Sequence, residues 1–342
     1  MESHKSHKSP ITLTSFVEQV DEHVNQFRSL NRVNAEDIIQ FIRDFMMPKR
    51  INVTYEHLSC LEERNSFRIV LTSKRAKANF GIPLVRECNG AIILIEEGTT
   101  TVGCRLICRP AHEFNPKINN TQWVNTNIKN GLYEIYFIED GSTLNLSWLS
   151  DEWVLSSKNT YNTSGNVWRG KSYGDAIAEV LANYPDFSYD NLDTDKTYTI
   201  GFKHPDHHPF GQHNGELLRA WFIQSADVQT GDISYSEKIG LPLQDRTRIS
   251  AQGGQFWQAA KKKAQNALQD FTVAVTNGDS QRPFLGYILR SRDRNRTRHY
   301  SDILVESTLL SEIRNCVYQS PYISNRQLLE RARQNFRILD FV

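Results

Sequence analysis

Three short strand patterns lie within residues 133–155, and they constrain the possible folds of this chain more than any other feature. Residues 133–138 alternate between the two faces of a strand, residues 144–148 place Leu and Trp on one face, and residues 153–155 form a third apolar segment. Polar turns separate the three segments. Period-two patterns broken by such turns are typical of neighbouring antiparallel strands, so the sequence predicts an antiparallel meander here.

The rest of the chain adds further strands and several amphipathic helices. Short apolar or alternating runs predict strands at 67–71, 90–95, 101–107, 197–203, 217–223, 284–290 and 296–305. Apolar residues at helical spacing predict helices at 15–30, 34–46, 172–184, 255–271 and 325–339. Ser15 with Glu18, and Ser172 with Asp175, have the spacing of a capping box. We expect an α+β fold dominated by antiparallel sheet.

Four parts follow from these patterns. We expect a disordered tail at 1–12, a helical N-terminal segment at 13–55, a β-rich domain at 56–310 and a helical C-terminal segment at 311–342. The tail carries no apolar stretch of the kind found in a signal peptide, and no apolar run elsewhere is long enough to span a bilayer. No membrane partner is expected.

Charge and cysteine content limit the classes of function. The chain has 40 Lys+Arg and 39 Asp+Glu, a net charge of +1, which excludes a globally basic nucleic-acid coat and leaves only a local basic patch. The 5 Cys are scattered and odd in number, which argues against a disulfide scaffold. Reduced thiols indicate the cytoplasm, which for a viral protein would be the host cytoplasm.

Six motifs follow one another in a distinctive order between about residues 60 and 310. They are residues 87–93, 109–114, 136–142, 156–159, 198–205, and 285–288 together with 298–301. In order and spacing they resemble the phage-type, tRNA-repairing RNA ligases of the covalent nucleotidyltransferase superfamily. The resemblance implies the antiparallel-sheet nucleotidyltransferase fold of RNA and DNA ligases.

The resemblance also implies a set of charged residues in the pocket. In that family a lysine of a Lys-x-Asp-Gly motif attacks the α-phosphate of ATP and holds AMP as a phosphoramidate. Glutamates on neighbouring strands bind the ribose and the metal. Two lysines on a late strand neutralise the triphosphate as charge builds on the pyrophosphate.

This sequence departs from the family at those positions. The nucleophile position is Ile138, whose alkyl side chain has no lone pair. The remaining degenerate positions are the two acidic ones, now Gly201 and Leu285, and the two late-strand lysines, now Arg298 and Tyr300. Asn89 stands where an arginine is expected, and Glu113 displaces a lysine. We therefore predict no catalytic residues and no metal site.

Some positions keep the family's residue type. Arg109, Asp140, Gly141 and Lys158 match it, and the resemblance implies that they contact a nucleotide or RNA. The alternative for residues 140–142 is a turn that requires glycine. The alternative for Lys158 is a solvated surface lysine.

An arginine-rich segment lies near the C-terminal end of the β-rich domain. Its members recur at every second residue: Arg290, Arg292, Arg294, Arg296 and Arg298. On a hairpin, several guanidinium groups would share one face and could follow the phosphates of tRNA or another structured RNA. The alternative is a hairpin edge that charge keeps soluble.

A loop rich in histidine follows the strand predicted at 197–203. It holds His204, His207, His208 and His213. A zinc or manganese site is one reading, but no cysteine lies nearby and acidic residues are few, so we favour a polar loop.

The leading hypothesis is a catalytically inactive RNA-ligase-like protein that uses the scaffold to bind RNA or protein. The first alternative is a divergent, active ATP-dependent RNA ligase with a non-standard lysine such as Lys129 or Lys203, and only then would ATP and Mg²⁺ be cofactors. The second is a structural or virion interaction protein that binds no nucleic acid.

Overall fold

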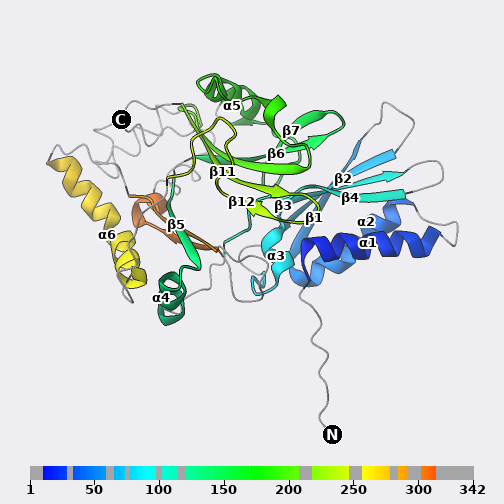
Figure 1. The fold of residues 1–342 in the computed structure, drawn as a ribbon, viewed down its shortest axis with the longest axis horizontal. Helices are drawn as coiled ribbons and strands as arrows, with labels where there is room; N and C mark the ends of the chain where they lie inside the picture. The colour runs from blue at the N-terminus through cyan, green and yellow to red at the C-terminus, as the bar shows by residue number, and fades with distance from the viewer. Residues whose placement is uncertain are drawn as a thin grey trace, which may run out of the picture.

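The structure is a computed structural model, and its described residues form three larger antiparallel sheets and one two-stranded sheet (Figure 1). It describes residues 11–28, 34–58, 65–73, 78–97, 102–114, 121–139, 141–168, 170–207, 218–245, 256–277, 284–291 and 302–312. The mixture of helices with antiparallel sheet confirms the predicted α+β class. No helix in these ranges is long and apolar enough to cross a membrane.

The first sheet has the strand order β1-β2-β3-β4. The strands are β1 (Ile51–Leu58), β2 (Asn65–Ser73), β3 (Asn89–Glu97) and β4 (Val102–Cys108). One face packs against α1 (Leu13–Arg28), α2 (Ala35–Met46) and α3 (Pro83–Glu87). Ile93 and Ile95 point to these helices, while Ile92 and Leu94 point to the second sheet. Burial on both faces explains the continuous apolar run in β3.

The second sheet has the order β12-β11-β10-β6-β7. Its strands are β6 (Ser142–Leu149), β7 (Glu152–Ser156), β10 (Lys196–Lys203), β11 (Arg219–Asp227) and β12 (Ile233–Ser234). Helix α5 (Tyr173–Leu181) covers one face, and the short strands β8 (Val167–Trp168) and β9 (Lys171–Ser172) precede it. Ser172 accepts a hydrogen bond from the Asp175 N–H, which confirms the predicted cap of α5.

The third sheet has the order β14-β13-β5. Its strands are β5 (Tyr133–Phe137), β13 (Gly286–Ser291) and β14 (Ile303–Glu306). Helices α4 (Thr121–Lys129) and α6 (Phe256–Thr276) pack on one face through Val124, Trp257, Ala260 and Ala264. The other face carries Tyr136 and Ile288.

The predicted three-stranded meander is wrong in one respect. Strands β6 and β7 pair as expected, but β5 pairs with β13, with Phe137 opposite Tyr287. The chain therefore passes from the third sheet to the second between β5 and β6, and these two strands do not form a hairpin. Alternation identified the strands, but their partners depend on contacts across more than a hundred residues.

The N-terminal boundaries also differ from the prediction. Helix α1 begins at Leu13, and Thr12 and Ser15 exchange the hydrogen bonds of its N-terminus, so the expected pairing of Ser15 with Glu18 is not used. Strand β1 starts at Ile51, where the β signal of the sequence begins. Helices α3 and α4 had not been predicted. The helix predicted at 325–339 lies outside the described residues.

Candidate functional site

The position of the expected nucleophile lies in an apolar cluster. Ile138 follows β5 and is 8% exposed. Its side chain belongs to a cluster with Leu285, Ile288 and Leu309, and its backbone N–H donates to the Gly286 carbonyl oxygen at 3.1 Å. Ile138 and Leu285, two positions at which the resemblance implies a charged residue, therefore meet in one hydrophobic cluster.

Trp221 occupies the space beside a third such position. Gly201 in β10 pairs with Trp221 in β11, and a Cβ placed on Gly201 would lie 2.1 Å from the indole Cε2. A Cβ on Gly141 would lie 2.6 Å from Cη2 of the same ring. The indole is buried. No carboxylate can stand at position 201 while the ring lies there.

Arg219 supplies positive charge beside this indole. Its guanidinium lies 3.5 Å from the Glu139 carboxylate and 3.5 Å from that of Asp245. Glu139 follows Ile138 directly, so Arg219 joins the second sheet to the segment that leaves β5. The two carboxylates already compensate this cation.

Lys158 is paired with the residue that displaces a family lysine. Its ammonium group contacts the carboxylate of Glu113, which is buried. The backbone of Lys158 passes close to Gly90, where a Cβ would lie 2.8 Å from the Lys158 Cα. The φ of Gly90 is +96°, a conformation that favours glycine. A phosphate at Lys158 would have to compete with the Glu113 carboxylate.

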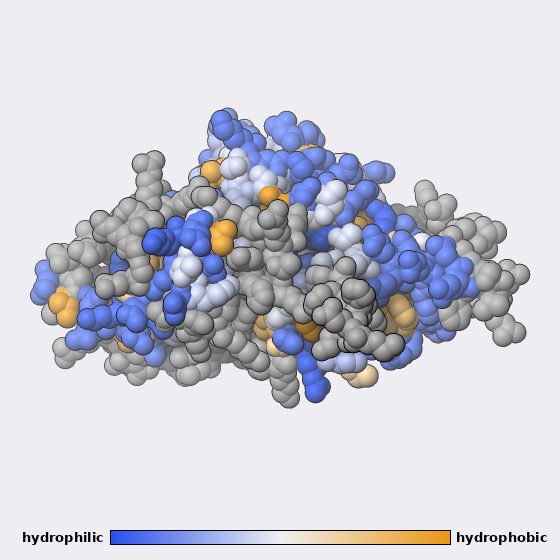
Figure 2. Space-filling view, turned by 60° about the horizontal axis from the view of Figure 1, so that its bottom comes forward, coloured by the Kyte–Doolittle hydropathy of each residue, from blue (hydrophilic) through white to orange (hydrophobic). Residues whose placement is uncertain are grey.

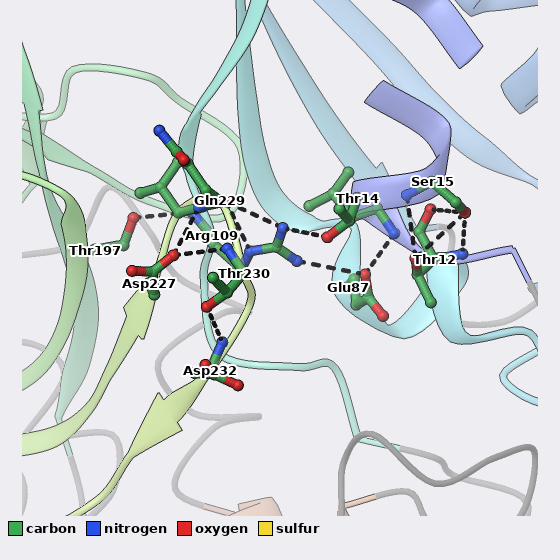
Figure 3. A network of polar contacts seen from close by, with 12 residues as sticks. Thr12, Thr14, Ser15, Glu87, Arg109, Thr197, Asp227, Gln229, Thr230 and Asp232 are labelled. Carbon is green, nitrogen blue, oxygen red and sulfur yellow. Dashed lines mark hydrogen bonds and ion pairs between the residues drawn. The ribbon is translucent and has the colours of Figure 1, made fainter. Parts of the chain in front are cut away.

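Arg109 lies between α1 and the turn that follows β11 (Figure 3). Its guanidinium donates to the Thr14 hydroxyl at 2.8 Å and to the Val228 carbonyl at 3.1 Å, and it lies 3.7 Å from the Glu87 carboxylate. Burial lowers the pKa of Arg109, and Glu87 and Asp227 act against that shift. Among the described residues, the guanidinium thus contacts α1, the turn after β11 and α3. It also lines a cavity of 290 Å³ beside α1.

Arg290 is the described member of the arginine-rich segment, and it is buried at 3% exposure. Its guanidinium lies 3.6 Å from the Asp302 carboxylate and 5.7 Å from the centroids of the Tyr136 and Tyr235 rings. Arg290 therefore does not lie on an exposed basic hairpin. Arg292, Arg294, Arg296, Arg298, Tyr300 and Asp140 lie outside the described residues.

The two described histidines of the predicted loop take part in local polar contacts. His204 Nε2 lies 2.9 Å from Glu179, and His207 Nε2 lies 3.1 Å from the Lys171 carbonyl oxygen. Burial lowers the pKa of His207. Across the described part of the chain, no group of three His, Cys, Asp or Glu side chains is placed to hold a metal ion. His208 and His213 lie outside it.

The two lysines considered as substitute nucleophiles lie in different places. Lys203 ends β10 opposite Arg219 and directly follows Phe202, whose carbonyl oxygen approaches Gly141. Lys129 is exposed at the end of α4. Of the two, Lys203 is adjacent to the degenerate positions.

The sequence alone did not identify Trp221 as part of this site. One sequence feature could have indicated it: Gly201 lies inside a predicted buried strand, and a glycine there often marks the close approach of another group. The structure brings Ile138, Gly141, Gly201, Trp221 and Leu285 to the segment that links the second and third sheets. The side chains at these positions are apolar or absent, so they offer no nucleophile, base or metal ligand.

Comparisons with known proteins identify viral relatives of this chain. No family model matches the chain. A protein named "Putative RNA-ligase" from African swine fever virus is 28% identical over 300 residues, covering 77% of this chain and 62% of that protein. A second, from a Malawi isolate of the virus, is 25% identical over 290 residues. The chain therefore spans less than two thirds of the length of these relatives.

Solved structures with a similar arrangement have low overall agreement. A Naegleria gruberi RNA ligase mutant with ATP and Mn shares 8% identity at a TM-score of 0.34, over 56% of this chain and 55% of the other. A "Putative ATP-dependent DNA ligase" from Aquifex aeolicus shares 10% identity at a TM-score of 0.39, over 88% and 70%. These scores are too low to support an argument about this chain.

Proposed function

We propose that this chain is an RNA-ligase-like protein without ligase activity, which uses the scaffold to bind RNA or protein. The observation that carries the proposal is the burial of Ile138 with Leu285 in one apolar cluster. An alkyl group cannot attack the α-phosphate of ATP, and a phosphoramidate with AMP cannot form there. The name of the viral relatives supports the ligase-like scaffold.

The neighbouring positions support the same proposal. Trp221 fills the space that a side chain at Gly201 would need, and Glu113 compensates the charge of Lys158. Phosphoryl transfer from ATP depends on cations and metal ions that neutralise charge as it develops. A site that has lost the nucleophile and these charges together would need several replacements to regain activity. One restored lysine would not suffice.

The direct test is adenylylation. The purified protein is incubated with α-labelled ATP and Mg²⁺ or Mn²⁺, with an active ATP-dependent RNA ligase as the positive control. We expect no covalent AMP on this protein, either in the wild type or in Ile138→Lys. Covalent AMP on the wild-type chain would overturn the proposal.

If covalent AMP forms, lysine variants would identify the residue that carries it. Lys203 is adjacent to the degenerate positions, whereas Lys129 is exposed at the end of α4. Loss of the adduct in Lys203→Ala but not in Lys129→Ala would establish the alternative, an active ligase with a substitute nucleophile. ATP and a divalent metal would then be its cofactors.

We also propose a cytoplasmic location. Cys88, Cys104 and Cys108 are buried and free. Burial raises the pKa of Cys108, so its thiol stays protonated and unreactive near neutral pH. Free thiols of this kind are usual in a reducing compartment.

A further inference from the structure

Four lysines surround the contact between α4 and α6. They are Lys129, Lys261, Lys262 and Lys263, and we refer to them as the lysine face. Lys129, Lys262 and Lys263 are exposed, and Lys261 is half-buried. Because the proposed ligase-like function uses none of them, their concentration on two adjacent helices needs its own explanation.

The two helices that carry these lysines pack against each other. Val124 of α4 belongs to the same core cluster as Trp257, Ala260 and Ala264 of α6, and Ile128 packs against that cluster. The Asn125 side chain accepts a hydrogen bond from the Trp257 N–H at 2.9 Å. Lys129 directly follows Ile128 of α4, Lys261 directly follows Ala260 of α6, and Lys263 directly precedes Ala264, so these three lysines adjoin residues of the contact in sequence.

No carboxylate accompanies the lysine face in sequence. Residues 121–132 and 256–269 contain four lysines and neither Asp nor Glu, in a chain that has 39 acidic residues. On α6, no acidic side chain stands three or four positions from Lys261, Lys262 or Lys263. A solvated helix usually interleaves opposite charges at that spacing, whereas adjacent like charges repel each other.

The lysines also form no ion pair with the described residues. Lys261 lies 5.5 Å from the Trp257 ring centroid and Lys263 lies 4.5 Å from that of Phe284, so aromatic rings support two of the side chains. Neither contact neutralises the charge. Since none of the described carboxylates pairs with these lysines, α4 and α6 carry a local excess of positive charge, which favours a polyanion.

The neighbouring side chains favour a nucleic acid over a membrane. Exposed amides share the two helices, at Gln122, Gln258, Gln265, Asn266 and Gln269. Amides are common contacts to phosphates and sugars. Helix α6 exposes one large hydrophobic side chain, Val273 at 53%, which lies ten residues beyond Lys263, and a single such side chain gives little area for insertion into lipid. At the end of the molecule that carries α6, Figure 2 shows hydrophilic residues beside a small hydrophobic spot.

We propose that the lysine face binds the phosphate backbone of RNA. The choice of RNA over DNA rests on the proposed function, while the position of the surface rests on the charges alone. This surface lies on the helices outside the third sheet, apart from the buried Arg290. Binding there would follow backbone charge and would not depend on the sequence of the RNA.

The test measures RNA affinity against salt. Fluorescence anisotropy of a labelled RNA stem-loop is recorded between about 50 and 200 mM salt, for the wild type and for K261Q/K262Q/K263Q. We expect the variant to bind at least about tenfold more weakly. The negative slope of log K against log salt should become shallower by about 2 to 3. Lys129→Gln should reduce the slope by about a further 0.7 to 0.9.

A matched control removes the same charge elsewhere. Arg43, Arg105 and Lys238 are exposed on α2, β4 and the segment after β12, and replacing all three by Gln should leave the slope nearly unchanged. Circular dichroism checks that each variant is folded.

Three outcomes would overturn the inference. They are equal losses in both triple variants, absence of salt-dependent RNA binding in the wild type, and binding of phosphatidylserine vesicles without RNA binding. None of these bears on adenylylation, so failure here leaves the proposed loss of ligase activity intact. A covalent AMP adduct would overturn the proposed loss of ligase activity, and the salt titration would still decide whether the lysine face binds RNA.

Discussion

At the scale of single residues, the degenerate positions are filled by the protein itself. Ile138 and Leu285 share an apolar cluster, and the Trp221 indole lies against Gly201 and Gly141. Apolar side chains occupy the space around these positions, so no void or exposed surface is left there. Close packing of this kind makes reversal by one substitution costly, because interiors tolerate extra volume poorly.

A double-mutant cycle tests this packing. Gly201→Ala should lower the free energy of unfolding by about 1 to 3 kcal/mol, because its Cβ would overlap the indole of Trp221. In a Trp221→Ala background the same change should cost about 0.5 kcal/mol or less, since the obstacle is gone. Urea denaturation gives the four free energies.

Gly103→Ala provides the control for this cycle. Gly103 lies on β4, and a Cβ there would meet nothing within 4 Å. A Gly201→Ala cost no larger than the Gly103→Ala cost would show that the indole does not fill the space beside position 201.

At the scale of elements, Arg109 joins three parts of the fold. It follows β4 and contacts Thr14 in α1 and the Val228 carbonyl beyond β11, with Glu87 of α3 nearby. Glu87 also accepts a hydrogen bond from the Leu13 N–H, the first residue of α1. One guanidinium thus supports the docking of the N-terminal helix onto the sheets (Figure 3).

Removal of this guanidinium should loosen α1. Arg109→Ala should lower the free energy of unfolding by about 3 to 5 kcal/mol, because it removes a buried cation that faces the Glu87 carboxylate and bonds to Thr14 and the Val228 carbonyl. Arg105→Ala on the same strand breaks only the exposed pair with Glu96 and should cost about 1 kcal/mol or less.

Two measurements check this prediction. Chemical denaturation gives the free energies, and hydrogen exchange of α1 shows whether the helix opens locally. Similar costs for the two arginine variants, with unchanged protection in α1, would contradict the role assigned to Arg109.

At the scale of the whole molecule, buried polar groups make stability depend on pH. His207 is 2% exposed, packs against Tyr173 at 4.7 Å between ring centroids and approaches the Lys171 carbonyl. Burial lowers the pKa of His207 below its ordinary value of 6.5. The unfolded chain therefore binds a proton at this residue more readily than the folded chain, and falling pH favours unfolding.

The pH dependence of unfolding tests this. As the pH falls below about 6.5, the wild type should lose free energy of unfolding until the folded-state pKa is reached. His207→Gln should flatten the dependence in that window, because its amide does not titrate. His57→Gln, at an exposed position on β1, should keep the wild-type slope. Parallel slopes in all three proteins would rule out His207 as the source.

The sequence by itself determined most of the elements. Alternation and apolar runs located most strands of the three sheets, although β1 and β12 were not among the predicted strands, and helical spacing located α2 and α5. The motif order also marked Ile138, Gly201 and Leu285 as positions without charge. These features depend on residue type and near neighbours, which the sequence states directly.

Only the tertiary structure decided what surrounds those residues. The sequence did not show that β5 leaves the meander to pair with β13, that Trp221 lies against Gly201, that Glu113 meets Lys158 or that Arg290 is buried. Periodicity assigns a side chain to a face of its strand, but the partner on that face comes from a distant part of the chain. Burial and charge pairing are properties of that partner as much as of the residue, so they arise only when the sheets assemble.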